Sequence, residues 1–462
     1  MLRSGEVQIT SAPVVTRDMV IVGSSIDDNQ RVGAPRGTLH AYDVVTGAPR
    51  WTFDAIPSGA AGPISMDWKA DIAPTGAANV WAPISVDEER SLIFLPTTSP
   101  SPDFFGGERP GDNRHADSVV ALYAETGRLA WAFQVTHHDL WDYDLPAQPT
   151  LGLVTYGSRT APAVIQATKQ GLVFTLDRVT GEPLIPVEER DVPQGGAAGE
   201  QLSSTQPFPI APRPLAPSRI KPDDSFGLTW WDSGKCREII SSARAEGLYT
   251  PPSSRGTILY PFTGGGMNWG GLAFDPMRNI VYVNTSSAMH LVTLIPAADF
   301  AAARKAFPGK EISPQRGTPF AVKREVIVSP FGLPCNPPPW GRLHAIDMHD
   351  GKVLWEVPLG TMEDIMPLSQ YILGNTGTPN LGGPIVTASG LVFIGAAMDN
   401  YLRAFDAKTG KELWRGRLPA GGQATPMTYV WKGRQYVVIA AGGHAKLDTK
   451  RGDSIFAFAL PH

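Results

Sequence analysis

One short pattern recurs along the chain and restricts the fold more than any other feature. Each copy is an apolar run with the character of a β-strand, followed by a turn that contains Gly and by a Trp four residues after the Gly. Most copies also carry an Asp where the strand ends. The copies are LHAYDVVTGAPRW, VVALYAETGRLAW, LHAIDMHDGKVLW and LRAFDAKTGKELW, which end at Trp51, Trp131, Trp355 and Trp414, and VFTLDRVTGEPLI, which has no Trp.

The repeat predicts antiparallel hairpins. Asp and Gly are turn residues, and the β-branched runs on either side favour strands. A Trp at one fixed place in each unit is best explained as an anchor that packs between neighbouring units. Units of about 40 to 50 residues with short strands are typical of a β-propeller. We therefore expect an all-β fold with five blade-like units and a last half unit at 426–460.

Composition excludes several classes of function. The net charge is −4, charged residues make up only 18% of the chain, and no run of Lys or Arg resembles a nucleic-acid footprint. Gly (48) and Pro (43) are abundant, but 42% hydrophobic residues and 12 Trp argue against disorder. The chain has neither an apolar run of signal-peptide length near its start nor 18 consecutive apolar residues, so we expect no export signal and no membrane span in it.

Two long insertions interrupt the repeat, at 187–259 and 287–339. Long loops on one face of a propeller usually cover or shape the site at its axis, so we expect a lid and a wall. The two cysteines, Cys236 and Cys335, match no zinc or redox motif. Whether they form a disulfide or remain buried thiols is open at this stage.

The segment VTHHDLWDYDLP is the first candidate for chemistry. Its three carboxylates, Asp139, Asp142 and Asp144, stand among aromatic residues directly after a predicted strand. Crowded carboxylates lose solvation and repel one another, which favours a bound cation or a general base; the alternative is a turn that uses Asp as a cap. Lys169 precedes a second strand and lies either at the site or in solvent.

Other motifs carry no clear chemistry. His137 and His138 are adjacent, so in a strand they face opposite ways and cannot bind one metal together. The glycine-rich segments TGGGMNWGG and LPAGGQATP fit neither a P-loop nor a dinucleotide fingerprint, because no unit of strand, GxGxxG and helix surrounds them. Nucleotide binding is therefore unsupported.

Longer motifs carry a family resemblance. ANVWAPISVD, HHDLWDYDLPAQPTL, QATKQGLVFTLDR, EGLYTPPS, MNWGGLAFDP, GLPCNPPPWG, DNYLRAFDAKTGKELW and QYVVIAAGGH occur in order along nearly the whole chain. Together they resemble the membrane-bound quinoprotein glucose, quinate and shikimate dehydrogenases. The resemblance implies an eight-bladed propeller that binds pyrroloquinoline quinone (PQQ) and Ca²⁺ or Mg²⁺. It also implies oxidation of a cyclic polyol or sugar, with glucose slightly favoured over quinate, transfer of electrons to ubiquinone, and a place on the periplasmic side of the inner membrane.

The resemblance also assigns site residues. Asp142 matches the general base, and Lys169 matches the cation that contacts the quinone oxygens. Trp81 matches the aromatic that stacks on the quinone, and Asp28 with Asn29 matches the metal-binding segment. In LPTTSPSPDFFGG a further metal ligand falls on Thr98, Ser99 or Ser101. Further residues match the cofactor face of the site: Asn284, Asp399, Asn400 and His444.

The first repeat aligns within the family's propeller and not at its beginning. We therefore expect residues 1–462 to form one propeller domain, incomplete at about five to six blades, with no transmembrane domain, and to be a fragment of a longer enzyme. Two alternatives remain. The chain could be a non-catalytic propeller scaffold of the quinoprotein-repeat type, or a truncated enzyme that binds the cofactor weakly or not at all.

Overall fold

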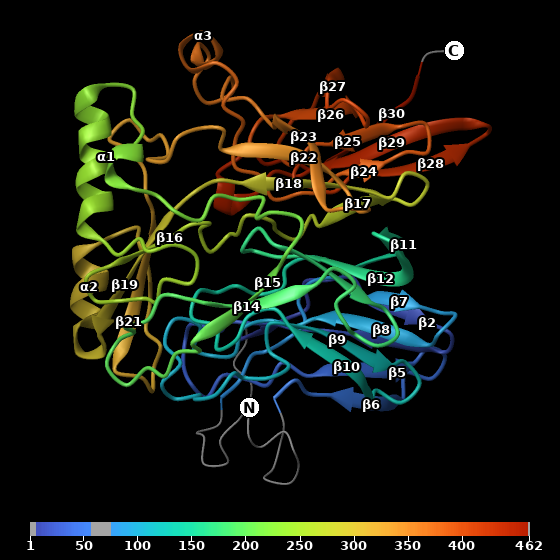
Figure 1. Ribbon diagram of the computed structural model, residues 1–462, viewed down its shortest axis with the longest axis horizontal. Helices are drawn as coiled ribbons and strands as arrows, with labels where there is room; N and C mark the ends of the chain where they lie inside the picture. The colour runs from blue at the N-terminus through green and yellow to red at the C-terminus, as the bar shows by residue number, and fades with distance from the viewer. Residues whose placement is uncertain (1–5, 57–74, 461–462) are drawn as a thin grey trace.

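The computed structural model describes residues 6–56 and 75–460, and its regular structure is almost entirely β (Figure 1). Three α-helices interrupt the strands: α1 (Trp230–Ser242), α2 (Phe300–Ala306) and α3 (Ser369–Leu373). Among the described residues no helix is long and apolar enough to cross a membrane.

Six antiparallel sheets follow one another in chain order, and in each the strands lie in the order of the sequence. The first two consist of β2 (Val14–Thr16), β3 (Met19–Val22), β5 (Leu39–Asp43) and β6 (Pro49–Phe53), and of β7 (Ser85–Asp87), β8 (Leu92–Pro96), β9 (Ser118–Tyr123) and β10 (Leu129–Gln134). The third consists of β11 (Thr150–Tyr156), β12 (Arg159–Ala167) and β13 (Val173–Asp177).

The other three sheets repeat the same order. They consist of β17 (Leu272–Asp275), β18 (Ile280–Ser286), β22 (Gly341–Asp347) and β23 (Lys352–Pro358); of β24 (Ile385–Val386), β25 (Leu391–Ile394), β26 (Tyr401–Asp406) and β27 (Glu412–Arg417); and of β28 (Met427–Trp431), β29 (Arg434–Ala441) and β30 (Ser454–Phe458). The first strands of successive sheets contact one another, β2 with β7, β7 with β11, β11 with β17 and β17 with β24. The sheets are therefore arranged like blades whose inner strands come first, rising from blue to red in Figure 1.

Three of the repeated Trp residues, Trp51, Trp131 and Trp355, anchor a blade to the next one. Trp51 Nε1 donates to the carbonyl oxygen of Ala124, at 2.8 Å, and its ring covers the turn at Gly127. That glycine has a φ of +67°, and a Cβ there would lie 2.6 Å from the Trp51 ring, so the position excludes any side chain. The same pairing joins Trp131 to Gly181 and Trp355 to Gly410. The predicted role of the repeated Trp is confirmed.

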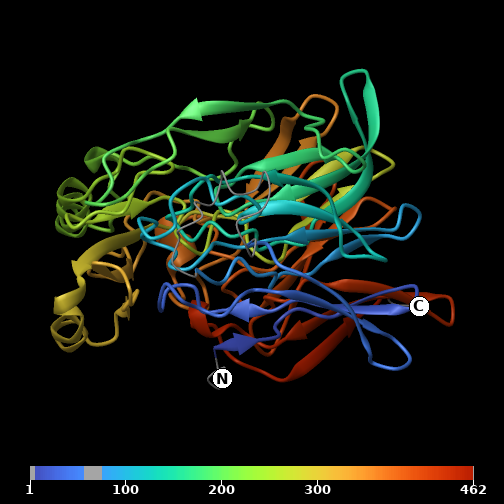
Figure 2. The same ribbon diagram turned by 90° about the horizontal axis from the view of Figure 1, so that it is seen from below.

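The two insertions together build a side lobe. A sheet in the order β16 (Thr257–Leu259), β19 (His290–Pro296), β21 (Phe320–Val326) and β20 (Glu311–Ser313) takes strands from both, and α1 and α2 belong to the same lobe. The lobe stands on one side of the blades in both views (Figures 1 and 2). Cys236 and Cys335 form a disulfide that ties one insertion to the other, which settles the pairing left open by the sequence.

Short elements complete the chain. β1 (Val7–Gln8) pairs with β4 (Ser25–Ile26), and β14 (Val187–Asp191) pairs with β15 (Thr205–Pro209). Within the part of the chain that the structure describes, 3₁₀ turns lie at Pro222–Asp224, Ala297–Asp299 and Ala445–Leu447.

Candidate active site

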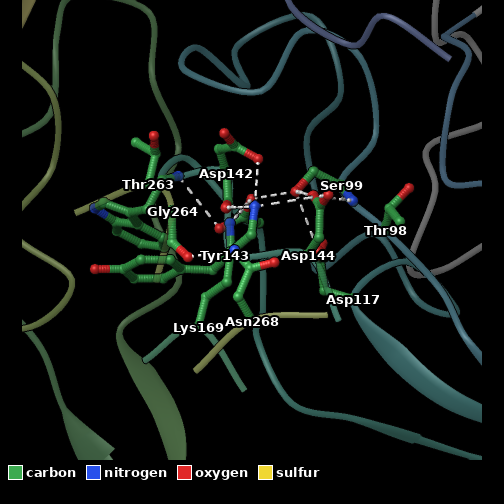
Figure 3. A network of polar contacts seen from close by, with 12 residues as sticks. Thr98, Ser99, Asp117, Asp142, Tyr143, Asp144, Lys169, Thr263, Gly264 and Asn268 are labelled. Carbon is green, nitrogen blue, oxygen red and sulfur yellow. Dashed lines mark hydrogen bonds and ion pairs between the residues drawn. The ribbon is translucent and has the colours of Figure 1, made fainter. Parts of the chain in front are cut away.

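Asp142 lies at the centre of a buried polar network (Figure 3). It follows β10 with a φ of +59°, a left-handed conformation that Asp tolerates better than most residues. Its Oδ1 accepts a hydrogen bond from Lys169 Nζ at 2.8 Å, and its carbonyl oxygen accepts a second from the same ammonium at 2.6 Å. Its Oδ2 accepts from an Arg324 NH group at 3.0 Å. Two cations from distant parts of the chain therefore hold one carboxylate.

These surroundings act on the pKa of Asp142 in opposite directions. Burial is the largest effect and raises it, while the positive charge of Lys169 lowers it; the negative charge of Asp144 raises it again and Arg324 lowers it. The net effect is an upward shift of the Asp142 pKa. A raised carboxyl pKa makes a better proton acceptor, because basicity rises with pKa.

Lys169 lies in the turn between β12 and β13, and the glycine-rich segment that fitted no nucleotide motif covers it. Gly265 has a φ of +82°, and a Cβ there would lie 2.7 Å from Lys169 Cγ. Gly266 N donates to the Lys169 carbonyl oxygen at 2.6 Å. Burial lowers the pKa of Lys169, but the negative charges of Asp142 and Asp144 raise it by more than burial lowers it. The net shift of the Lys169 pKa is therefore upward. Lys169 is thus a buried, protonated cation and not a solvated one.

Asp144 connects Lys169 to Trp81. Its Oδ2 accepts from Trp81 Nε1 at 2.8 Å and lies 3.7 Å from Lys169 Nζ. Its Oδ1 accepts from Ser99 Oγ at 2.9 Å. Burial raises the Asp144 pKa, but the charge of Lys169 and the hydrogen bonds from Trp81 and Ser99 more than offset this, so the pKa is lowered. Asp144 is therefore an ionised carboxylate that fixes the indole of Trp81.

Ser99 joins three carboxylates. Its hydroxyl lies 3.2 Å from Asp117 Oδ1, 2.5 Å from Asp139 Oδ2 and 2.9 Å from Asp144 Oδ1. A hydroxyl has one proton to donate, so another of these contacts needs a protonated carboxyl group as its donor. Burial raises the pKa of Asp139 to about 6 and that of Asp117 well above its ordinary value. If Ser99 donates to the ionised Asp144, protonated Asp117 and Asp139 can each donate to the Ser99 oxygen, and all three contacts are satisfied.

Asp28, in the predicted metal-binding segment, lies close to Asp142. One carboxylate oxygen each from Asp28, Asp103 and Asp142 lie within 4.8 Å of one another. Ser101 Oγ donates to the Asp28 carbonyl oxygen at 2.8 Å and so fixes its segment. Asn29 Oδ1 accepts from the Gln30 side chain at 2.6 Å. The cluster is rich in carboxylate oxygens and is partly buried, with Asp103 fully buried, and it fits a hard divalent cation.

The remaining predicted residues lie in two other networks. Asn284 donates to Asn380 Oδ1 and to the Gly382 carbonyl at 2.8 Å, while its own Oδ1 is buried without a partner. Asp399 is held by Arg403 through two hydrogen bonds, at 2.9 and 2.6 Å. Asn400 donates to Asp364 at 3.0 Å. Within residues 6–56 and 75–460, no hydrogen bond joins Asp399 or Asn400 directly to Asp142.

His444 lines a cavity of about 790 Å³ at the inner ends of the blades. Trp269 and Gly270 also line this cavity, directly after Asn268 of the network in Figure 3. His444 Nδ1 is buried without a partner, as is Asn400 Oδ1. Of these two residues only His444 lines this cavity, so its ring nitrogen is the unpartnered polar atom there that a ligand could hydrogen-bond.

Two residues of the site were missed by the sequence analysis. Arg324 comes from the side lobe, 182 residues from Asp142, and no motif marks it. Asp103 stands in the quoted stretch LPTTSPSPDFFGG, where only hydroxyl residues were considered as metal ligands. A search for carboxylates in that stretch could have found it. His137 and His138 bind Glu189 and Glu200, at 3.1 and 2.8 Å, which agrees with a structural role.

Comparison with known proteins identifies the chemistry of related chains. Residues 2–437 match the family model described as "PQQ: Glucose/ethanol/alcohol dehydrogenase, beta-propeller domain". The quinoprotein glucose dehydrogenase of Escherichia coli (strain K12) is 41% identical over 99% of this chain and 58% of its own length. The quinate/shikimate dehydrogenase (quinone) of Acinetobacter baylyi (strain ATCC 33305 / BD413 / ADP1) is 39% identical over 98% and 57%. The chain thus spans less than two thirds of these relatives.

Solved structures support the fold. The quinohemoprotein alcohol dehydrogenase from Comamonas testosteroni matches with a TM-score of 0.66 at 23% identity, over 99% of this chain and 61% of that one. A europium-containing methanol dehydrogenase matches with a TM-score of 0.65 at 23% identity, over 95% and 66%. At this level of identity the likeness concerns the fold alone, and with the family model it confirms the predicted all-β propeller.

Proposed function

The chain belongs to the PQQ-dependent glucose/ethanol/alcohol dehydrogenase β-propeller family, and on this basis we propose that it carries the site for PQQ-dependent oxidation of a sugar or cyclic polyol. The observation that carries the proposal is the partly buried carboxylate of Asp142, held between the buried cations of Lys169 and Arg324. A propeller that serves only as a scaffold has no need for such a costly arrangement of buried charges.

Asp142 is the proposed general base. Oxidation of an alcohol requires removal of the hydroxyl proton and of a hydride from the same carbon. The raised pKa of Asp142 suits it to take the proton. Once Asp142 has taken the proton, Lys169 still balances the negative charge of Asp144, because the ammonium stays protonated. When bound, PQQ supplies the acceptor for the hydride.

Lys169 and Trp81 are the proposed contacts to the cofactor. The ammonium has three N–H groups and gives two of them to Asp142, so one remains for a quinone oxygen. Trp81 is half-buried, and its indole nitrogen is fixed by Asp144. A flat aromatic ring held in this way can support a flat quinone. Asn284, Asp399, Asn400 and His444 remain predicted contacts further around the site.

The proposed cation is Ca²⁺ or Mg²⁺, with Asp28 and Asn29 as predicted ligands. Thr98, Ser99 and Ser101 remain candidates, although Ser99 and Ser101 already donate to other oxygens of the site. A cation at this place would favour the ionised form of Asp142 and polarise an oxygen bound beside it. It would therefore support both binding and proton removal.

The acceptor and the location are proposed from the family resemblance. We propose ubiquinone as the final electron acceptor and the periplasmic side of the inner membrane as the location of the whole protein. The name of the quinate/shikimate relative includes a quinone acceptor. Substrate choice between glucose and quinate is also part of this proposal.

Titration of the purified chain with PQQ tests the function. The quinone absorbance is followed in the presence of Ca²⁺ or Mg²⁺, and dye reduction is measured with glucose and with quinate. Saturable binding with turnover is expected. A folded chain that binds PQQ weakly or without turnover would favour a truncated enzyme, and one that binds no PQQ would agree with either the scaffold or a truncated enzyme whose site is incomplete.

A further inference from the structure

Asp103 is buried without a hydrogen bond to its carboxylate among the described residues. Its side chain is fully inaccessible to solvent, and neither carboxylate oxygen has a hydrogen-bond partner within the described residues. An ionised carboxylate that is neither solvated nor hydrogen-bonded costs several kcal/mol. A group of this kind needs an explanation beyond packing.

Protein cations do not supply that explanation. Arg324 is the nearest relevant cation, but its NH groups donate to Asp142 and to Glu311. Its guanidinium also lies over the ring of Phe104, 5.0 Å from the ring centre. Asp28 and Asp142 place two further carboxylate oxygens within 4.8 Å of it. Like charges this close repel, most strongly around the fully buried Asp103, so the arrangement calls for a positive ion.

The spacing of the three carboxylates fits one ion. Oxygen ligands lie about 2.3–2.6 Å from Ca²⁺, so two ligands on opposite sides of the ion are about 4.6–5.2 Å apart and other pairs are closer. The oxygens of Asp28, Asp103 and Asp142 all lie within 4.8 Å of one another, which is the range that a shared ion requires. Asp103 offers both of its oxygens, since neither is used elsewhere.

We propose that Asp103 is a direct ligand of a hard divalent cation, together with Asp28 and Asp142. The inference rests on the proposed function and adds a ligand that the family resemblance does not assign. Ser101 then positions a ligand and does not itself bind the ion, because its hydroxyl hydrogen-bonds to the backbone carbonyl oxygen of Asp28. The cation then joins three segments of the chain, at 28, 103 and 142.

Asp103→Asn is the test, because the amide keeps the shape of the side chain and removes its charge. Apo protein is prepared with EDTA, and CaCl₂ and MgCl₂ are titrated calorimetrically with and without PQQ. Loss of a residue that only hydrogen-bonds to a metal ligand typically weakens metal binding about 10- to 100-fold. Loss of a direct ligand should therefore weaken it at least that much. Glu311→Gln is the control; it removes a carboxylate that also pairs with Arg324 but lies outside the cluster, and should leave affinity unchanged.

Thermal unfolding separates ligation from a structural role. In Asp103→Asn the apo protein should have an unchanged or higher Tm, because repulsion is relieved, while the rise in Tm on adding Ca²⁺ should shrink. A lower apo Tm with a full response to Ca²⁺ would overturn the proposal, as would unchanged affinity or no cation binding by the wild-type chain. Dye reduction by the wild-type chain measures the proposed function separately. Turnover without any cation would overturn the ligand role of Asp103 but would still support the proposed function.

Discussion

Lys169 Nζ binds both the carbonyl oxygen and the carboxylate of Asp142, at 2.6 and 2.8 Å. One ammonium thus fixes the backbone and the side chain of the proposed base at once. This matters because Asp142 has a φ of +59°, a conformation that must be held by its surroundings. The cation and the base act as one unit, which the first two predictions test separately.

Asp142→Asn should abolish turnover and leave PQQ binding largely intact. The amide has the same shape but cannot take the hydroxyl proton, and a positioned base typically contributes about 10²–10⁴-fold to the rate. Steady-state dye reduction and PQQ titration are the measurements. Asp223→Asn changes an exposed carboxylate that pairs with Arg237 and serves as the control, which should turn over normally. Normal turnover in Asp142→Asn would remove this residue from the mechanism.

Lys169→Ala should weaken retention of PQQ and lower stability. The change leaves Asp142 and Asp144 buried without their shared cation. Breaking a buried ion pair by removing one partner costs about 3–5 kcal/mol. PQQ titration and urea unfolding measure the two effects, with Lys169→Arg as the variant that keeps the charge. Unchanged affinity for PQQ in Lys169→Ala would count against its role at the cofactor.

Arg324→Met should lower turnover although Arg324 belongs to the side lobe. Loss of its hydrogen bond to Asp142 Oδ2 frees one side of the carboxylate, and a small misplacement of a reacting group can cost on the order of 10²-fold. Arg304→Met removes an exposed arginine from α2 in the same lobe and is the matched control. Equal loss of activity in both variants would show a general effect on the lobe, contrary to this prediction.

Glu200→Gln should reduce stability at neutral pH and remove part of its acid dependence. Burial raises the pKa of Glu200, but the hydrogen bond and charge of His138 and the Gly106 N–H outweigh burial, and the pKa is lowered. A carboxyl whose folded pKa is depressed stabilises the fold above its unfolded pKa of about 4.5 and loses that contribution as pH falls through the folded value.

Hydrogen bonds to charged groups contribute about 1.5–3 kcal/mol, which is the expected loss in Glu200→Gln at pH 7. Urea unfolding at pH 7, 5 and 4 gives the free energies, and the difference between wild type and variant should shrink as the pH falls. Glu188→Gln changes an exposed carboxylate on β14 and should show no such trend. A difference independent of pH would mean that Glu200 acts through packing alone.

Several parts of the fold could be predicted from the sequence because they depend on neighbours along the chain. The turn Gly and the Trp four residues later belong to one hairpin, so their spacing predicts both the strands and the anchor at Trp51, Trp131 and Trp355. The crowding of Asp139, Asp142 and Asp144 is visible in the same way. The side lobe was foreseen only as loops, because the partners in its sheet come from separate insertions.

The sequence by itself determined the repeating hairpins and the family, and it predicted Asp142 and Lys169 as site residues, because each depends on a local pattern or a long motif. Only the tertiary structure decided that Cys236 pairs with Cys335, that Arg324 reaches Asp142 across 182 residues, and that Asp103 meets Asp28. These contacts join segments far apart in the chain. No local pattern encodes them, because they form only when the blades and the lobe pack together and exclude water from the charges between them.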